Sequence, residues 1–210
     1  MGALLDILLV NTGDKYPTIF TDNIIHMLEK TGTKYDNIHI ITDEQYEGVW
    51  NKLQLFRDFK KGPYLYLDLD VCIKGNIEHL QREELHILHA WWRTRHHTPL
   101  NSSIMSWSGD YSYYYKVFAS NPEYYMLTYQ GIDEFIYNLD NVVYKTYNPV
   151  CTSFNWHGFD EQWDVILFNQ AYHKMTEYGP WSKYMLFDVE PNMDPITKAA
   201  YANSFRKLNS

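Results

Sequence analysis

The 210-residue sequence has little cysteine, no long apolar run and a shortage of positive charge. Its two cysteines, Cys72 and Cys151, fit no metal-binding spacing and no disulfide framework, so we expect two reduced thiols in the core. No apolar run approaches the ~20 residues that cross a bilayer. Lys and Arg number 18 against 26 Asp and Glu, and the net charge of −8 argues against nucleic acid as the main partner, because phosphate binding needs clustered cations.

The start of the chain lacks the basic residues of a signal peptide, and Asp6 interrupts its apolar stretch. This segment fits an opening buried strand better than a targeting sequence. We therefore expect a soluble, intracellular protein with no transmembrane segment.

Aromatic residues are plentiful, with 19 Tyr, 7 Trp and 10 Phe, and the 45% share of hydrophobic residues is that of a globular protein. Surplus Tyr and Trp suit interfaces or platforms for sugars and bases, because each ring has a flat apolar face and a polar tip. We expect one domain over residues 1–188. Residues 189–210, with Pro191 and Pro195, predict a surface helix or a loosely held tail.

Apolar runs and helical patterns alternate through the first third of the chain. Strands are predicted at Leu4–Val10, Ile38–Ile41 and Tyr64–Leu67. Between them we expect a helix capped at Thr21-Asp22 and a helical stretch over Trp50–Phe56. This alternation predicts an α/β fold, with a mainly parallel sheet flanked by helices. In the second half, strands are predicted at 85–92, 101–107, 142–146 and 165–168, and helices at 111–119 and 132–139.

Polar residues follow each of the first three predicted strands, at Asn11–Asp14, Thr42-Asp43 and Asp68/Asp70. Ligands collect at such carboxyl ends of strands. Two close carboxylates repel each other and raise one pKa unless a cation lies between them. Mg²⁺ and Mn²⁺ prefer carboxylate oxygens and keep positions free for substrate phosphates. Asp68 and Asp70 therefore favour a metal that bridges the protein to a diphosphate; the alternative is a solvated strand end in which Asp70 caps the next turn.

An apolar strand followed by Asp-x-Asp also occurs in haloacid-dehalogenase-type phosphatases, whose first aspartate is the nucleophile. Those enzymes place the pair near the start of the chain and need a later acidic pair. Here the pair follows the third predicted strand, and no later acidic pair follows an apolar strand. A phosphatase with Asp68 as its nucleophile is the less favoured alternative.

Seven segments, in order along residues 5–185, resemble those of GT-A glycosyltransferases, in particular glycogenin-like and related bacterial and viral enzymes. The segment Leu65–Leu80 resembles the strand that carries the family's Asp-x-Asp metal motif. The other six are Asn11–Tyr16, Thr42-Asp43, Trp50–Phe56, Asn101–Met105, Tyr129–Ile136 and Phe168–Trp181. The resemblance implies a Rossmann-like GT-A fold and a metal-dependent enzyme. That enzyme would move a sugar from a nucleotide-diphosphate donor to an acceptor with retention, in the cytoplasm (of the host, if the chain is viral).

The resemblance also implies roles for single residues. Asp68 and Asp70 would bind Mn²⁺ or Mg²⁺, with Asn169 in place of the family's late histidine ligand. Asp133, which stands where the family has a glutamine, would orient the sugar as the catalytic residue, and Ile132 stands where the family has its aspartate. The donor would contact Asp68 and nine further residues, with Tyr16 stacking on the base: Thr12, Asp14, Tyr16, Asp43, Lys52, Asn101, Ser102, His173 and Lys174.

The chemistry of glycosyl transfer independently favours a metal ion and a basic side chain beside the donor diphosphate. Negative charge develops on the departing diphosphate, and a metal at Asp68 and Asp70 with a cation from Lys174 or His173 would stabilise it. A chain of net charge −8 needs the metal's charge to accept an anionic donor. A nucleotide- or sugar-binding module that kept the fold and lost activity is the alternative, because Ile132 and Asn169 depart from the family pattern.

A cluster of histidines suggests a zinc site at first sight. It consists of His86, His89, His96 and His97. On a strand, residues 86 and 89 point to opposite faces, so a partly exposed loop fits this cluster better than one structured metal site.

The segment around these histidines bears on the acceptor, whether carbohydrate, lipid-linked or protein. Arg93 and Arg95 would either bind an acceptor phosphate or be solvated. Trp91-Trp92 lies just before the predicted Asn101 strand, which makes it the candidate wall of an acceptor site. No residue identifies the donor sugar.

Overall fold

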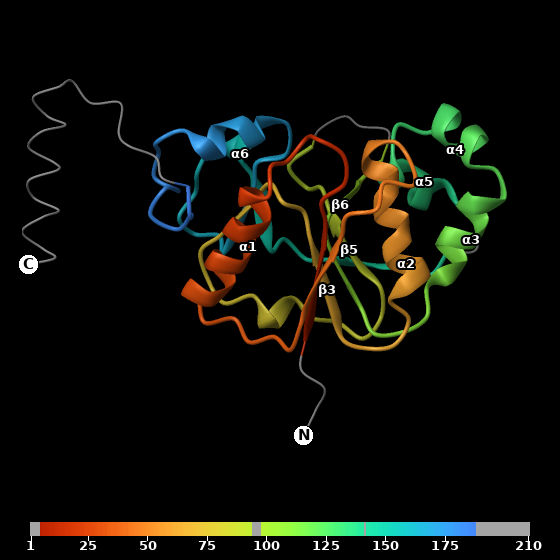
Figure 1. The fold of residues 1–210 in the computed structure, drawn as a ribbon, viewed down its shortest axis with the longest axis horizontal. Helices are drawn as coiled ribbons and strands as arrows, with labels where there is room; N and C mark the ends of the chain where they lie inside the picture. Colours follow the sequence, from red (N-terminus) through yellow and green to blue (C-terminus); the bar gives the residue numbers. More distant parts are fainter. Residues whose placement is uncertain (1–4, 94–97, 141, 188–210) are drawn as a thin grey trace, which may run out of the picture.

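The structure, a computed structural model, describes residues 5–93, 98–140 and 142–187. At its centre is a six-stranded sheet with the order β2-β1-β3-β6-β5-β7 (Figure 1). The β1–β2, β1–β3 and β5–β7 pairs are parallel, and β6 runs against its neighbours β3 and β5. The expected α/β fold with a mainly parallel sheet is therefore confirmed. The strands are β1 (Asp6–Val10), β2 (Ile38–Ile41), β3 (Tyr64–Leu67), β5 (His86–His89), β6 (Leu100–Trp107) and β7 (Lys145–Tyr147).

Both faces of this sheet are buried, because residues of the central strands alternate between two cores. Ile7 and Leu9 belong to a core shared with helix α1 (Ile19–Lys30), whereas Leu8 belongs to the opposite core. Figure 1 shows α1 on one side of the sheet and α2, α3 and α5 on the other. The opposite side carries η1 (Gly48–Leu53), α2 (Gln54–Asp58), α3 (Ser112–Ser120), α4 (Pro122–Thr128) and α5 (Ile132–Asn138).

A second sheet of three strands, in the order β4-β9-β8, continues from the end of β3. β4 is antiparallel to β9, with Val71 opposite Leu167. Next to this pair, the Phe168 amide donates to the Asp70 carbonyl oxygen at 2.8 Å. The contact between β4 and β9 thus places Asn169 and the residues that follow it next to Asp68 and Asp70. The remaining elements are β4 (Val71–Ile73), η2 (Glu78–Leu80), β8 (Cys151–Ser153), α6 (Phe154–His157), β9 (Val165–Leu167) and η3 (Asn169–Thr176).

The expected start of the first helix is wrong. α1 begins at Ile19 with Thr18 at its N-cap, so Thr21 and Asp22 lie inside the helix. Thr21 is buried, and its hydroxyl accepts a hydrogen bond from the Asn11 side chain at 3.1 Å. The residue that was expected to cap the helix instead ties it to the loop that follows β1.

Some short elements also differ from expectation. β5 ends at His89 rather than at residue 92, and β7 spans Lys145–Tyr147 rather than 142–146. The strands β4 and β8 were not expected, because three residues are too few to show a period. Both cysteines, Cys72 and Cys151, are buried and free.

Three sequence-based expectations fall outside the described residues. They are the tail over 189–210, the residues His96 and His97 of the suggested zinc site, and Arg95. The domain division at residue 188 therefore stays a prediction. Within the described ranges, no helix combines the length and the apolar character needed to cross a membrane.

Candidate functional site

The Asp68/Asp70 pair lies in the short connection from β3 to β4. Leu69, between the two aspartates, is 2% exposed and packs in the core, whereas Asp68 and Asp70 both line one cleft. The Asp68 amide donates to the Ser103 carbonyl oxygen at 2.9 Å, and the Asp70 carbonyl oxygen accepts from Phe168. The backbone of the pair is thus fixed by β6 on one side and by the β9 end on the other.

Lys52 of η1 neutralises the Asp68 carboxylate. Its Nζ lies 2.6 Å from Asp68 Oδ1 and 2.9 Å from Oδ2, and it donates to Ser102 Oγ at 3.3 Å. The Tyr66 hydroxyl also donates to Asp68 Oδ1. Burial opposes the charge of Lys52, but the carboxylates of Asp68 and Asp133 outweigh it and raise the Lys52 pKa. Both oxygens of Asp68 therefore have partners within the protein.

Asp70 is in the opposite situation. It is 4% exposed, and one oxygen, Oδ2, accepts from the Tyr16 hydroxyl at 2.6 Å. The other oxygen, Oδ1, is buried with no hydrogen-bond partner among the described residues. Burial, and then repulsion by Asp68, raise the pKa of Asp70 to about 6, although Tyr16, Lys15 and Lys52 pull it down. The positive charge near the Asp70 carboxylate therefore does not offset its burial and its repulsion by Asp68.

Asn169 presents a second buried oxygen of the same kind. Its side-chain oxygen Oδ1 has no hydrogen-bond partner in the described part of the chain, and its backbone φ is 46°, in the left-handed region that Asn tolerates better than most residues. Asn169 and Asp70 line one cleft of about 540 Å³. An orphaned buried acceptor is costly, and backbone strain collects at functional sites. Two such acceptors facing one cleft favour a bound cation.

The oxygen ligands fit a hard divalent cation. Asp70 and Asn169 each have an oxygen without a partner among the described residues, and Asp68 would share its carboxylate between the metal and Lys52. Among the described residues there is no group of three or more His, Cys, Asp or Glu side chains that could hold a metal. The set is therefore two carboxylates and an amide, an oxygen-only set that suits Mn²⁺ or Mg²⁺ rather than zinc.

The opposite wall of the cleft comes from β6 and the start of α5. Asn101 and Ser102 are buried and line the cleft, and the Ser102 amide donates to Asp133 Oδ1 at 2.9 Å. Asp133 and Ile132 both belong to the lining of the cleft, but the Ile132 side chain is 1% exposed and packs in the core. The acidic group that α5 offers to the cleft is therefore that of Asp133.

The loop after β1 contributes Tyr16 and Lys15. The Tyr16 ring packs against Phe20 and Tyr172, with centroid distances of 5.1 and 5.3 Å, and Lys15 Nζ lies 4.4 Å from its centroid. Burial, and then Asp70, raise the Tyr16 pKa above its ordinary value, so the hydroxyl stays a donor to Asp70. The stacking of Tyr16 on a base stays a prediction. Two further predicted residues, Thr12 (half-buried) and Asp14 (exposed), do not line this cleft.

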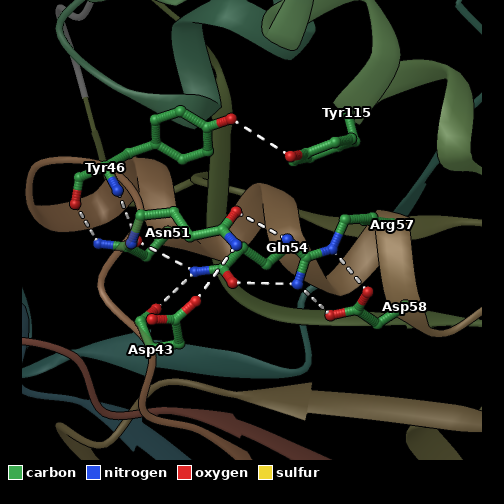
Figure 2. Close-up of polar contacts among 8 residues, drawn as sticks. Asp43, Tyr46, Asn51, Gln54, Arg57, Asp58 and Tyr115 are labelled. Atoms are coloured by element: carbon green, nitrogen blue, oxygen red, sulfur yellow. Dashed lines mark hydrogen bonds and ion pairs between the residues drawn. The ribbon is translucent and has the colours of Figure 1, made fainter.

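The loop after β2 carries Asp43 and is held by a polar network (Figure 2). The buried Asn51 side chain accepts from the Gln45 and Tyr46 amides at 2.9 and 3.0 Å and donates to the Gly48 carbonyl oxygen at 3.1 Å. Gln54 donates to the Asp43 carbonyl oxygen at 2.8 Å. Asp43 is exposed and does not line the cleft, but this network fixes its position.

His173 and Lys174 lie apart from the cleft. They line a second groove of about 720 Å³, which shares Arg93, Asn169 and Gln170 with the first. Lys174 Nζ pairs with the Glu177 carboxylate at 2.9 Å. The structure thus brings nine predicted residues to two adjoining cavities and leaves Thr12, Asp14, Tyr16 and Asp43 outside their linings. The nine are Lys52, Asp68, Asp70, Asn101, Ser102, Asp133, Asn169, His173 and Lys174.

The two residues of the predicted acceptor wall, Trp91 and Trp92, have different surroundings in the structure. Trp92 lines the second groove but is 4% exposed, whereas Trp91 packs against His157 and Trp163 and donates to the Cys151 carbonyl oxygen. The exposed aromatic residue of this groove is Trp156, at 51%. Sequence reasoning missed Trp156, which no motif marks. It also assigned no role to Lys15 and Tyr66, which lie inside two of the seven segments, because only tertiary pairing places them at the site.

Comparison with solved structures identifies the fold. No protein-family model matches the chain, and no curated protein matches its sequence. A glycosyltransferase involved in the glycosylation of the major capsid of PBCV-1 is similar over 79% of this chain and 92% of its own, with 14% identity and a TM-score of 0.55. An active-site mutant of LgtC is similar over 89% and 98%, with 8% identity and a TM-score of 0.56.

The glycosyltransferase GlyE of Streptococcus pneumoniae TIGR4 is similar over 95% of this chain at 10% identity and a TM-score of 0.60. The chain spans 64% of GlyE's length, so GlyE contains parts with no counterpart in this match. At these identities the three structures show the fold alone. That fold is the one found in glycosyltransferases, as the resemblance implied.

We predict that Asn51→Ala will destabilise the protein by about 3 kcal/mol, because it removes the buried partner of two amides and a carbonyl in the Asp43 loop. Urea unfolding measures the effect. The exposed Asn148→Ala, outside this network, is the matched control and should change stability by less than ~0.5 kcal/mol. Equal losses in the two variants would contradict the role given to Asn51.

We predict that Asp70→Asn will stabilise the metal-free protein near neutral pH by up to about 3 kcal/mol. The pKa of Asp70 is about 6 in the folded protein, above its ordinary value of 3.8. Its contribution to the free energy of unfolding is therefore fully present below pH 3.8 and is lost as the pH rises through 6. Asn carries no charge, so its advantage should vanish at about pH 4. Urea unfolding in EDTA at both pH values, with the exposed Asp36→Asn as control, is the test. A pH-independent difference would show that Asp70 is not the destabilising charge.

Proposed function

We propose that the protein is a metal-dependent glycosyltransferase that moves a sugar from a nucleotide-diphosphate donor to an acceptor with retention. One observation carries the proposal. In a fold found in glycosyltransferases, Asp70 Oδ1 and Asn169 Oδ1 are buried, lack partners among the described residues and line the same cleft. Oxygens so placed suit a divalent cation that faces an anionic ligand.

Asp68, Asp70 and Asn169 would hold Mn²⁺ or Mg²⁺. When bound, the cation supplies a Lewis acid that stabilises the charge of the leaving diphosphate. Tyr16 keeps one Asp70 oxygen oriented, which leaves the other for the cation. The protein's excess of acidic residues makes a cation at this position necessary for an anionic donor.

The remaining cleft residues would bind and orient the donor sugar. Lys52 supplies a buried positive charge beside Asp68, and Asn101 and Ser102 provide side-chain polar groups on the β6 wall. Asp133, held by the Ser102 amide, would orient the sugar as the catalytic residue. Thr12, Asp14, Tyr16 and Asp43 would reach the nucleoside outside this cleft, with His173 and Lys174 on the diphosphate side.

The alternative is a module that binds nucleotide or sugar without turnover. The burial of Ile132, at the position of the family's aspartate, favours it, because the acidic group of this chain enters the cleft one residue later. A binding assay and a turnover assay together separate the two functions.

We predict that a thermal-shift screen of UDP-, GDP-, ADP- and dTDP-sugars will find a donor that stabilises the protein only with Mn²⁺ or Mg²⁺. A ligand at 100 times its Kd stabilises the native state by about 2.7 kcal/mol. With that donor, hydrolysis or transfer should fall at least ~100-fold in Asp70→Ala and Asn169→Ala. The exposed Asp36→Ala should behave like the wild type. The anomeric configuration of the product, read by NMR, tests retention.

Binding without turnover of the donor would favour the module. Metal-independent turnover would contradict the proposed metal site, and the absence of any nucleotide-sugar binding would contradict both functions.

A further inference from the structure

The second groove lies between α6 and η3 and opens beside the proposed donor cleft. It has a volume of about 720 Å³, and Arg93, Asn169 and Gln170 belong to both cavities. A molecule in this groove would therefore lie next to a sugar bound at the cleft. That position is the one an acceptor needs.

The two cavities have opposite charge. The cleft is lined by four acidic residues, Asp68, Asp70, Asp133 and Glu134, which outnumber the three basic residues of its lining, Lys15, Lys52 and Arg93. The lining of the groove, taken over the described residues, contains Arg93, His173 and Lys174 and no Asp or Glu. Two of these, His173 and Lys174, are proposed above to lie on the diphosphate side of the donor, which leaves Arg93 for a second anion. Glu177 partly offsets this charge from outside the lining, through its exposed pair with Lys174. On a chain of net charge −8, a pocket wall without carboxylates favours an anion.

Arg93 is the cation best placed to bind that anion. Its guanidinium is half-buried, and Nη1 donates to the Leu100 carbonyl oxygen at 3.1 Å. No carboxylate of the described residues lies within ion-pair distance of Arg93. A partly desolvated charge without a paired anion is costly, and the planar guanidinium offers further N–H donors to a carboxylate or a phosphate.

Trp156 supplies a free aromatic face in the same groove. It belongs to the four-residue helix α6 and is 51% exposed. The neighbouring rings are all used internally, since Phe154 stacks on Phe168 at 4.5 Å and Trp91 stacks on His157 at 5.1 Å. No aromatic contact involves Trp156 in the part of the chain that the structure describes. An exposed indole face suits an apolar sugar face, and the amide of Asn155 beside it suits hydroxyl groups.

We propose that the acceptor is an anionic saccharide, bound in this groove with a sugar ring on Trp156 and a carboxylate or phosphate at Arg93. The proposal rests on the proposed function. In the transfer, the acceptor hydroxyl oxygen bonds to the anomeric carbon as the bond from that carbon to the diphosphate oxygen breaks. The nucleoside diphosphate leaves, and the hydroxyl proton passes to it or to solvent.

Saturation-transfer NMR titrations with three matched sugars test this directly. The probes are methyl β-glucoside, methyl β-glucuronide and glucose 6-phosphate, used in EDTA so that no divalent cation offers another anion site. The two charged sugars should bind roughly tenfold more tightly than the neutral one. Whichever charged sugar binds more tightly distinguishes a carboxylate from a phosphate. High salt should reduce the preference, because screening weakens an exposed charge pair.

The variants separate the two contacts. Arg93→Gln should abolish the preference for the charged sugars, and Trp156→Ala should weaken all three sugars about fivefold. The matched controls, Lys145→Gln and the exposed Tyr137→Ala, lie outside the groove and should change neither. Equal affinities for all three sugars in the wild type would overturn the proposal, and so would a charge preference that survives Arg93→Gln.

Metal-dependent nucleotide-sugar binding, measured by thermal shift on the same protein preparations with Mn²⁺ or Mg²⁺ in place of EDTA, keeps the two proposals distinguishable. Loss of nucleotide-sugar binding with an intact charged-sugar preference contradicts the proposed function and supports an anionic-sugar site. Intact nucleotide-sugar binding in Trp156→Ala, with weakened sugar binding, supports the assignment of this groove to the acceptor.

Discussion

The site depends on the pairing of β4 with β9 immediately after the Asp68/Asp70 pair. Because Val71 lies opposite Leu167 and Phe168 donates to the Asp70 carbonyl, the chain delivers Asn169 to the aspartates from about a hundred residues away along the sequence. β6 fixes the other side through Asp68 and Ser103. The cleft thus lies between the two sheets, and the backbone pairing of their strands sets its geometry.

The polar groups of this cleft are not equally satisfied by partners within the protein. Lys52 and Tyr66 satisfy Asp68, whereas the second oxygen of Asp70 and the Asn169 side-chain oxygen have no partner in the described chain. Burial and repulsion raise the Asp70 pKa, so the metal-free site holds its charge at a cost that a cation would relieve. In the adjoining groove, which shares Arg93 with the cleft, basic residues outnumber acidic ones among the described lining residues. The two cavities therefore suit different ligands.

The parallel strands and the Asp68/Asp70 pair could be predicted from the sequence, because continuous apolar runs end in polar residues. The segments Ile38–Ile41 and Tyr64–Leu67 match β2 and β3 residue for residue. The strand β9 was predicted, at 165–168, but the second sheet was not, because β4 and β8 have three residues each and the sheet forms through long-range pairing. Trp156 was missed for a related reason: a Trp in a four-residue helix shows no pattern, and only its exposure beside a groove distinguishes it from core Trp.

The central claim is that a divalent cation binds where Asp70 and Asn169 present their free oxygens. Electron paramagnetic resonance of Mn²⁺ tests it most directly, because protein binding removes the sharp signal of the free ion. With UDP or GDP present at a fixed concentration, the wild type should bind one Mn²⁺ per chain in a saturable way, and Asp70→Asn and Asn169→Ala should bind it at least ~10-fold more weakly. The same free Mn²⁺ signal with wild type, with both variants and with nucleotide alone would contradict the account.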